Sequence, residues 1–208
     1  MSQASSKETK AQILDVAEGE MAQNGYAGTT LRNIVSKANV NLAAVHYHFG
    51  SKEDLFRAVI TRIAEPIVSG QLSALAELEA NNQEPLSVEE ILRAYVAPGF
   101  DCTVRKDAHP MRSQFFGRCR TEPEPIQSIA ATQFQPGVQK FLDALQRALP
   151  DQTRSQLTWK LDLVVSSLIR VLGQAGKPGA LITTDSPEDI EQAMTKLISF
   201  LIPGIERT

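Results

Sequence analysis

The sequence predicts an all-α fold, with a small N-terminal helical module ahead of a larger C-terminal one. Apolar residues recur at spacings of three and four along most of the 208 residues, which is the repeat of an amphipathic helix. Alternating runs of β-branched residues, which would indicate strands, are absent from the chain. Hydrophobic residues make up 42% of the sequence, which is ample for a packed core.

The first two helices are predicted from capping and stop signals. The first should start near Ser5 or Ser6, because Ser5 and Glu8 have the spacing of a capping box, and it should stop at Asn24-Gly25. The second should follow Thr30, whose hydroxyl is a good N-cap. The apolar residues expected to face inward are Ile13, Leu14, Ala17 and Met21 in the first helix and Leu31, Ile34, Val35 and Ala38 in the second.

The next two helices are predicted in the same way. Asn41 is expected to cap a third helix over residues 42–49, and Gly50 to end it. Ser51 and Asp54 then form a second capping box, which starts a fourth helix. The first 65 residues therefore contain four predicted helices.

The chain beyond Pro66 is expected to form the rest of a larger domain. The division suggested by the pattern is a module over residues 1–50 and a second domain over 51–208, with the helix from Lys52 linking them. The expected helices are 66–80, one capped by Ser87 and Glu90, 110–120, 124–148 with a kink at Pro136, 151–173, and an amphipathic last one capped by Ser186.

Composition indicates an ordinary soluble protein. The 21 Lys and Arg against 24 Asp and Glu predict, taken as a whole, neither a nucleic-acid nor a membrane partner. Two cysteines and three histidines suggest no disulfide framework, no metal site and no cofactor. A signal peptide is not recognisable, and no apolar run approaches the ~18 residues of a membrane span, so we expect a cytoplasmic protein.

Residues 21–52 depart from this acidic average. They contain Arg32, Lys37 and Lys52 but no Asp or Glu, where about four acids would be expected in proportion to length. A local positive surface on an acidic protein suits a compact DNA-binding module, because phosphate attraction needs clustered cations. The local charge pattern thus favours DNA as a partner, although the net charge of the whole chain does not.

Two short helices joined by a tight turn, the second rich in small residues, match helix-turn-helix geometry. Ala43 and Ala44 would permit close approach and contact thymine methyl groups, and His46 could meet a base edge. Tyr47 and His48 could reach phosphates. The spacing alone fits a helical hairpin with surface histidines equally well. A metal-binding histidine pair is disfavoured, because residues two apart do not share a helix face.

The stretch "TTLRNIVSKANVNLAAVHYHFGSKEDLFRAV", residues 29–59, resembles the DNA-binding segment of the tetracycline-repressor-like (TetR) family of bacterial transcription regulators. The resemblance extends back through "AQILDVAEGEMAQNGYAGTT" and covers roughly the first 60 residues. It implies that residues 42–48 form the recognition helix and that Tyr47, His48 and Lys52 hold phosphate. The DNA-contacting residues expected on this basis are Thr30, Arg32, Asn41, Leu42, Ala43, Ala44, His46, Tyr47, His48 and Lys52.

One position of the recognition segment departs from the family pattern. His46 stands where the family often has tyrosine, and "VNLAAVHYHFGSK" is most similar to the PsrA-type branch of fatty-acid-responsive regulators. This similarity implies a fatty acyl effector.

The resemblance also implies a homodimer of subunits with about nine helices, in which the last two helices pair across a four-helix interface and the other C-terminal helices surround an effector pocket. The segment 151–173 is apolar on a broad face and also at Trp159 and Leu163 opposite, so it should pack in two directions. A helix buried in a monomer would show the same pattern. The dimerisation residues expected are Leu161, Val165, Leu168, Leu172, Ile190, Met194, Leu197, Ile198 and Leu201.

The segment 110–120 contains a candidate ligand anchor. Arg112 lies near the centre of an apolar arc at ~100° per residue, and a buried guanidinium needs an anionic partner. An amphipathic acid would fit; a structural ion pair with Asp143 or Asp162, or solvent exposure, is the favoured alternative. The candidate effector residues are Arg112, Phe115, Phe116, Cys119 and Trp159.

The leading hypothesis is a homodimeric repressor that binds a palindromic double-stranded operator through two recognition helices about 34 Å apart and is released by a small effector. A ligand-independent adaptor that docks another protein through the Trp159 side is the alternative. An enzyme is not expected, because Asp107, His109 and Cys119 accompany no nucleophile elbow, phosphate loop or metal spacing.

Overall fold

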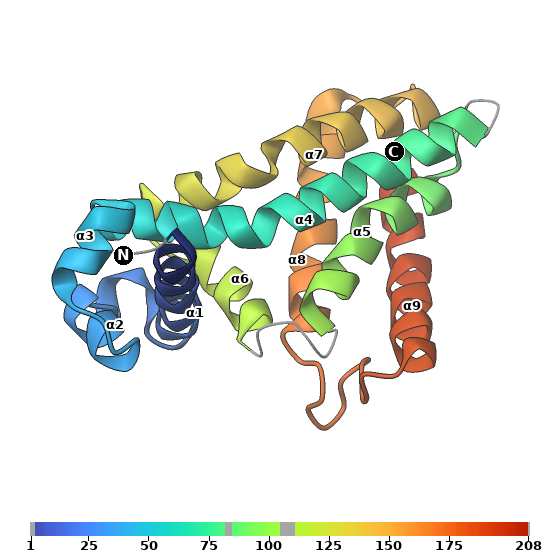
Figure 1. Ribbon diagram of the computed structural model, residues 1–208. Coiled ribbons are helices and arrows are strands. Elements are labelled where there is room, and N and C mark those ends of the chain that lie inside the picture. Colours follow the sequence, from blue (N-terminus) through green and yellow to red (C-terminus); the bar gives the residue numbers. More distant parts are fainter. Residues whose placement is uncertain (1–2, 82–84, 105–110, 208) are drawn as a thin grey trace. The chain divides into compact units, whose positions relative to one another are not determined.

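The computed structural model describes residues 3–81, 85–104 and 111–207, and within these ranges the chain forms nine α-helices and no strand (Figure 1). The predicted all-α fold is confirmed. No helix of the described ranges is both long and apolar enough to cross a membrane. The helices are α1 (Gln3–Gly28), α2 (Leu31–Lys37), α3 (Leu42–Phe49), α4 (Lys52–Asn81), α5 (Val88–Val104), α6 (Arg112–Cys119), α7 (Ile126–Ala148), α8 (Arg154–Leu172) and α9 (Pro187–Glu206).

The helices pack as two units. Residues 1–64 and 109–133 belong to the N-terminal unit, and residues 65–108 and 134–208 belong to the C-terminal unit, so that α4 and α7 contribute to both. These packing units differ from the segments 1–50 and 51–208. The expected division into a DNA-binding domain (1–50) and a ligand-binding and dimerisation domain (51–208) stays a prediction.

Two helix boundaries differ from the sequence prediction. The first helix already includes Gln3, so a start at Ser5 or Ser6 is too late; the Ser5 side chain and Pro110 lie outside the described residues. The predicted break at Pro66 is wrong, because α4 continues through it. A proline removes one backbone donor and strains one turn, and the buried residues on both sides of Pro66 hold the helix together.

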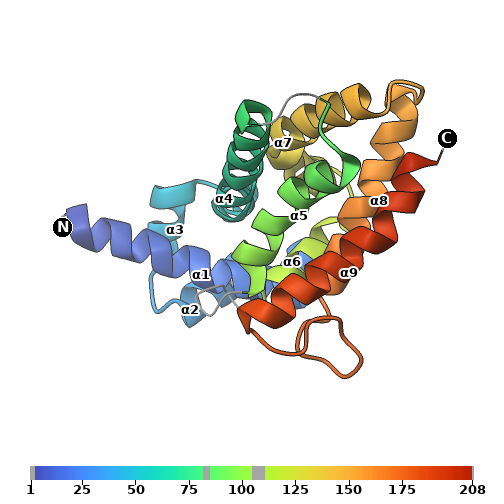
Figure 2. The same ribbon diagram turned by 90° about the vertical axis from the view of Figure 1, so that its right-hand side faces the viewer.

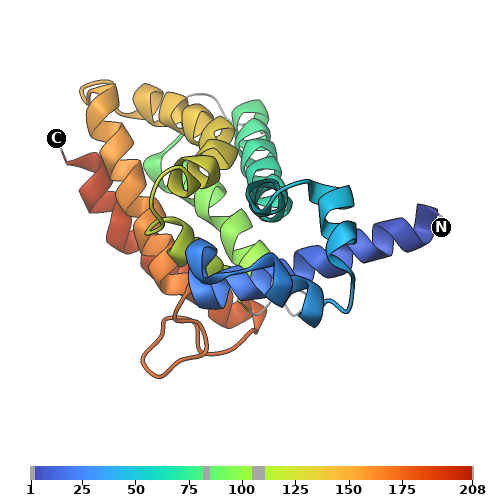
Figure 3. The same cartoon turned by 90° about the vertical axis from the view of Figure 1, so that its left-hand side faces the viewer.

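The N-terminal unit is built around α1, which contacts α2, α3 and α6 (Figure 3). Gly25 breaks α1 with φ 72° and ψ 174°, so the predicted stop at Asn24-Gly25 marks a real interruption, although helical structure resumes to Gly28. Ile13, Met21 and Phe56 are buried in this unit. The Phe56 ring lies between Tyr26 and Phe115, at centroid distances of 5.6 and 5.9 Å.

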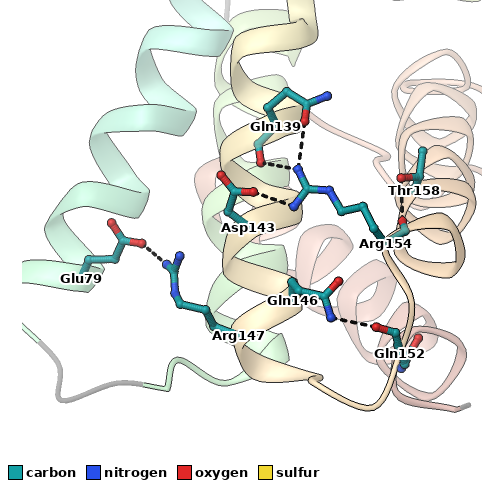
Figure 4. Close-up of polar contacts among 8 residues, drawn as sticks. All are labelled: Glu79, Gln139, Asp143, Gln146, Arg147, Gln152, Arg154 and Thr158. Carbon is teal, nitrogen blue, oxygen red and sulfur yellow. Dashed lines mark hydrogen bonds and ion pairs between the residues drawn. The ribbon is translucent and has the colours of Figure 1, made fainter.

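The C-terminal unit has one continuous apolar core, to which α5, α7, α8 and α9 contribute. Helices α8 and α9 lie side by side, and both contact α5 (Figure 2). Polar contacts join α7 to the start of α8: Arg154 bonds to Asp143 at 2.6 Å, and Gln146 donates to the Gln152 carbonyl at 2.7 Å (Figure 4). Exposed ion pairs of this kind add little stability, so apolar packing holds the unit together.

A buried lysine closes the end of α9. The Lys160 ammonium, on α8, donates to the side-chain oxygen of Gln152 at 2.5 Å, to the Ile205 carbonyl at 3.0 Å and to the Arg207 carbonyl. The carbonyls at a helix C-terminus lack intrahelical donors and carry partial negative charge, so a cation there is favourable. The start of α8 is thereby joined to the end of α9.

Replacement of Lys160 by methionine should lower the free energy of unfolding by about 1–3 kcal/mol, because buried acceptors lose their donor. Urea unfolding at fixed protein concentration measures the change. Lys140→Met, at an exposed position of α7, is the matched control and should stay within about 0.5 kcal/mol of the wild type. Equal midpoints for the two variants would contradict this role of Lys160.

Candidate nucleic-acid interface

Helices α2 and α3 are fixed by the caps that the sequence predicts. The Thr30 side chain accepts from the Asn33 amide at 3.1 Å, and the Asn41 side chain accepts from the Ala44 amide at 2.8 Å. Between the helices Asn39 has φ 48°, a left-handed conformation that asparagine tolerates better than most residues. The two helices and their tight turn form a helix-turn-helix.

Helix α3 has a buried side and an exposed side. Val45 and Phe49 are buried, as their spacing predicts, and they attach the helix to the N-terminal unit. The exposed side carries Ala43, His46 and Tyr47, and the Tyr47 side chain is 81% exposed. Among the expected contact residues, Thr30, Arg32, Asn41 and Leu42 are also exposed, whereas Ala44, His48 and Lys52 are half-buried.

The C-terminal end of α3 makes an unusual turn. Gly50 has φ 80° and ψ −74°, and the Ser51 amide donates to the Phe49 carbonyl at 3.0 Å, which together define a γ-turn with positive φ. The Gly50 amide donates to the His46 carbonyl at 3.0 Å. In return, Nδ1 of His46 lies 2.7 Å from the Gly50 carbonyl oxygen. The His46 ring is therefore held at an exposed surface.

The positive charges of this region are not equally available. Lys37 bonds to buried Glu20 at 2.5 Å, which neutralises much of its charge. The Lys52 ammonium lies 4.3 Å from the centre of the Tyr26 ring, a cation–π contact. Burial lowers the pKa of Lys52, and the nearby Glu122 carboxylate raises it. Arg32 is exposed on α2.

Helix α6 and the turn after it hold the broken end of α1. Arg118 donates to the Gln23 carbonyl at 2.7 Å, and the Tyr26 amide donates to Glu122 at 2.8 Å. Gly25 has φ 72°, a conformation that L side chains rarely adopt, and a Cβ there would lie 2.6 Å from the Glu122 carboxylate oxygen. Another residue would therefore strain the backbone and displace the Glu122 side chain. Sequence reasoning missed these contacts, because residues about 95 positions apart give no local signal.

The candidate effector residues are divided between the units. Phe115 and Cys119 are buried in the N-terminal unit, whereas Trp159 belongs to the C-terminal unit and is 53% exposed. Arg112 bonds to Glu18 at 3.1 Å, and the Glu18 side chain is fully buried and also bonds to Arg62 at 2.5 Å. This geometry favours the structural ion pair for Arg112, with Glu18 rather than Asp143 or Asp162 as the partner found.

The expected dimerisation residues line the core of their own subunit. Val165 and Ile190 are partly buried against it, and the others are buried in it: Leu161, Leu168, Leu172, Met194, Leu197, Ile198 and Leu201. Their expected role in dimerisation stays a prediction. The outward apolar side chains are Trp159 and Leu163, each 53% exposed, and Phe200, 77% exposed; we name these three the α8–α9 outer face.

The described part of the chain contains no metal-binding cluster, and its buried Cys119 thiol is not reactive. Groups of three or more His, Cys, Asp or Glu side chains placed to hold a metal ion are absent there. Burial raises the pKa of the Cys119 thiol to about 12, with a further contribution from Glu122, so the thiol stays protonated at neutral pH. Asp107 and His109 lie outside the described residues.

Two family models match the chain. Residues 13–59 match the model for bacterial regulatory proteins of the tetR family, and residues 93–204 match the model for the tetracyclin repressor-like C-terminal domain. The first match contains α2 and α3 with their caps, and the second covers more than half of the chain. The resemblance seen in the helix-turn-helix therefore extends into the C-terminal unit.

Similar proteins agree with the family models. The transcriptional activator FasR of Mycolicibacterium smegmatis is 31% identical over 117 residues, or 56% of this chain and 50% of FasR. The chain matches half or less of the length of its curated relatives. The Bacillus subtilis regulator FadR, solved with stearoyl-CoA, has TM-score 0.67 at 12% identity, covering 93% of this chain and 98% of FadR. A TetR-like regulator from Rhodococcus sp. RHA1 has TM-score 0.65 at 17% identity and full coverage of both chains. With both its helix-turn-helix and its C-terminal helices matched, the chain belongs to the TetR family of DNA-binding transcriptional regulators.

Proposed function

We propose that the protein is a homodimeric regulator that represses transcription from a palindromic operator and leaves it when a fatty acyl compound binds. The observation that carries the DNA-binding part is the exposed side of α3, which lies in a region of 32 residues without a carboxylate. Recognition helices of this kind enter the major groove, where acids would repel phosphate. We propose that the ten expected residues, from Thr30 to Lys52, make the contacts.

The homodimer is proposed to form through the α8–α9 outer face. At ~100° per residue, Trp159 and Leu163 project from α8 on the side opposite Leu161 and Leu168. Since Lys160 meets Ile205, both exposed side chains lie at the same end of the helix pair as Phe200. Large exposed apolar residues at one end of a helix pair are typical of subunit contacts.

The effector is proposed to be a fatty acyl compound, and regulation to follow from its preference for one conformation. The similarity of residues 40–52 to the fatty-acid-responsive branch and the stearoyl-CoA bound to FadR support this class. A ligand that favours subunits with mismatched recognition helices lowers DNA affinity by its differential binding. In the N-terminal unit, Arg118 of α6 and Glu122 of the turn after it bond to the end of α1, so a shift of α6 would reach the DNA-binding helices.

Selection of bound sequences from random duplexes tests the DNA-binding proposal, and should return a palindrome with two half-sites. The selected duplex then allows release to be tested with stearoyl-CoA and with stearic acid. Release by either compound, together with de-repression of a reporter, is the expected result. Binding that no acyl compound changes would favour the ligand-independent adaptor, and reporter activation would reverse the proposed sign of regulation.

Substitution of Lys52 by alanine should weaken the selected operator and random DNA to a similar degree. One lost phosphate contact reduces the slope of log affinity against log salt by about 1. Fluorescence anisotropy at several salt concentrations measures the slope. Lys140→Ala removes the same charge from α7 and should leave it unchanged; an unchanged slope for Lys52→Ala would exclude the phosphate contact.

The substitution Phe200→Glu should convert the dimer into monomers, because two negative charges would face each other in an apolar contact. Light scattering after gel filtration measures the mass. Leu181→Glu is the control, since Leu181 is an exposed apolar residue of the loop between α8 and α9. A dimeric Phe200→Glu protein would show that the subunits associate elsewhere.

Measuring stability and operator release in the same variant distinguishes two roles for Arg112, an ion pair with Glu18 and an anchor for the effector. If Arg112 chiefly pairs with Glu18, Arg112→Ala should lower the free energy of unfolding by about 1–3 kcal/mol and leave the releasing concentration of stearoyl-CoA unchanged. If it anchors the effector, that concentration should rise severalfold. The measurements are urea unfolding and an operator-release titration.

A further inference from the structure

The end of α3 determines which nitrogen of the His46 ring carries hydrogen. A carbonyl oxygen only accepts hydrogen bonds, so the 2.7 Å contact with Gly50 requires Nδ1 of His46 to be the donor. In a neutral imidazole one nitrogen donates and the other accepts. The Nε2 atom of the exposed His46 ring is therefore an acceptor whenever the ring is neutral.

The turn that creates this contact depends on glycine. A γ-turn with positive φ is rare and strained, and other residues avoid it because of their Cβ. At Gly50 the turn brings the carbonyl oxygen back to the ring of the residue four positions earlier, while the Gly50 amide bonds the carbonyl of that same residue. The backbone bond fixes Gly50 against His46, and the Nδ1 contact then restricts how the ring can rotate.

The surroundings of His46 leave its outer edge accessible. Ala43 lies three residues earlier and shares the exposed side of α3, and its small side chain allows close approach. Tyr47, the next residue, is also exposed and lies edge-on to His48 at 5.1 Å between ring centroids. Of the two histidines in α3, His46 is the exposed one.

We propose that His46 selects a base that offers an exocyclic amino group, either N6 of adenine or N4 of cytosine, at one position of each half-site. These are the two hydrogen-bond donors of the major groove, whereas guanine and thymine present acceptors there. The Nε2 lone pair complements the donors and is repelled by the acceptors. This inference rests on the proposed function, since it requires α3 to enter the major groove.

The tautomer is tested in the protein without DNA. Nitrogen-15 correlation spectra of the imidazole rings at pH 8, with His46→Gln to assign the resonances, should show hydrogen on Nδ1 and a bare Nε2. Hydrogen on Nε2 in the neutral ring would overturn the proposal, whatever the outcome of DNA selection.

The base contact is tested with analogues in the selected operator, at the position where His46→Ala relaxes sequence preference. Replacing adenine there by purine, or cytosine by 2-pyrimidinone, removes only the amino group. Wild-type affinity should fall roughly 3- to 10-fold more than that of His46→Ala, as one hydrogen bond is lost. Replacing adenine by 7-deazaadenine removes the N7 acceptor and should affect both proteins equally.

The outcomes distinguish this inference from the function on which it rests. Equal losses for the wild type and His46→Ala on removal of the amino group would overturn the contact. Failure to select any duplex sequence would reject the proposed function, and this contact with it. A bare Nε2 in the spectra would still stand in that case as a property of the fold.

Discussion

The N-terminal unit depends on the interruption of α1 at Gly25. A broken helix leaves carbonyls and amides without intrahelical partners, and such groups are costly when buried. Here Arg118, in α6, donates to one of these carbonyls, and Glu122, in the turn after α6, accepts from one of these amides. Phe115 adds apolar contact with Phe56, whose ring also meets Tyr26. Without this interruption, α6 would have no polar attachment at the end of α1.

The region around α3 shows how an acidic protein can keep a stretch of 32 residues free of carboxylates. That stretch contains α3, and the first acids after it are Glu53 and Asp54 at the start of α4. The buried acids of α1 are paired internally: Glu20 holds Lys37, and Glu18 holds Arg62 and Arg112. Buried carboxylates paired in this way project little negative charge outward. Helix α3 itself carries no acidic side chain, and Arg32 and Lys52 lie in the helices on either side of it.

Local features of the fold were predictable from the sequence, and long-range ones were not. The caps at Thr30, Asn41 and Ser186 were readable because a side chain and a backbone amide three residues apart decide them. The partner of Arg112 was not, since Glu18 lies 94 positions away. Periodicity showed that α8 is apolar on two sides, but could not tell which side faces its own core.

The candidate interface illustrates the same limit at closer range. Residue type and charge pointed to α3 and to His46, because small residues, rings and missing acids are visible in one dimension. The γ-turn at Gly50 was not visible, since glycine after a helix usually signals only a stop. What that turn does to the imidazole depends on φ and ψ, which the residue type permits but does not specify.

The hydrogen bonds from Arg118 and Glu122 to α1 also affect whether the N-terminal segment of such a regulator can be joined to another C-terminal domain. Residues 13–59 look like a transferable cassette, because they carry the family pattern for the helix-turn-helix. The end of its first helix is nevertheless held by hydrogen bonds to Arg118 and Glu122, which lie outside residues 13–59. If residues 13–59 were grafted onto a relative that lacks this pair, α3 would be kept, but the end of α1 would lose these two hydrogen-bond partners. We therefore expect residues 13–59 and the segment with Arg118 and Glu122 to be retained together.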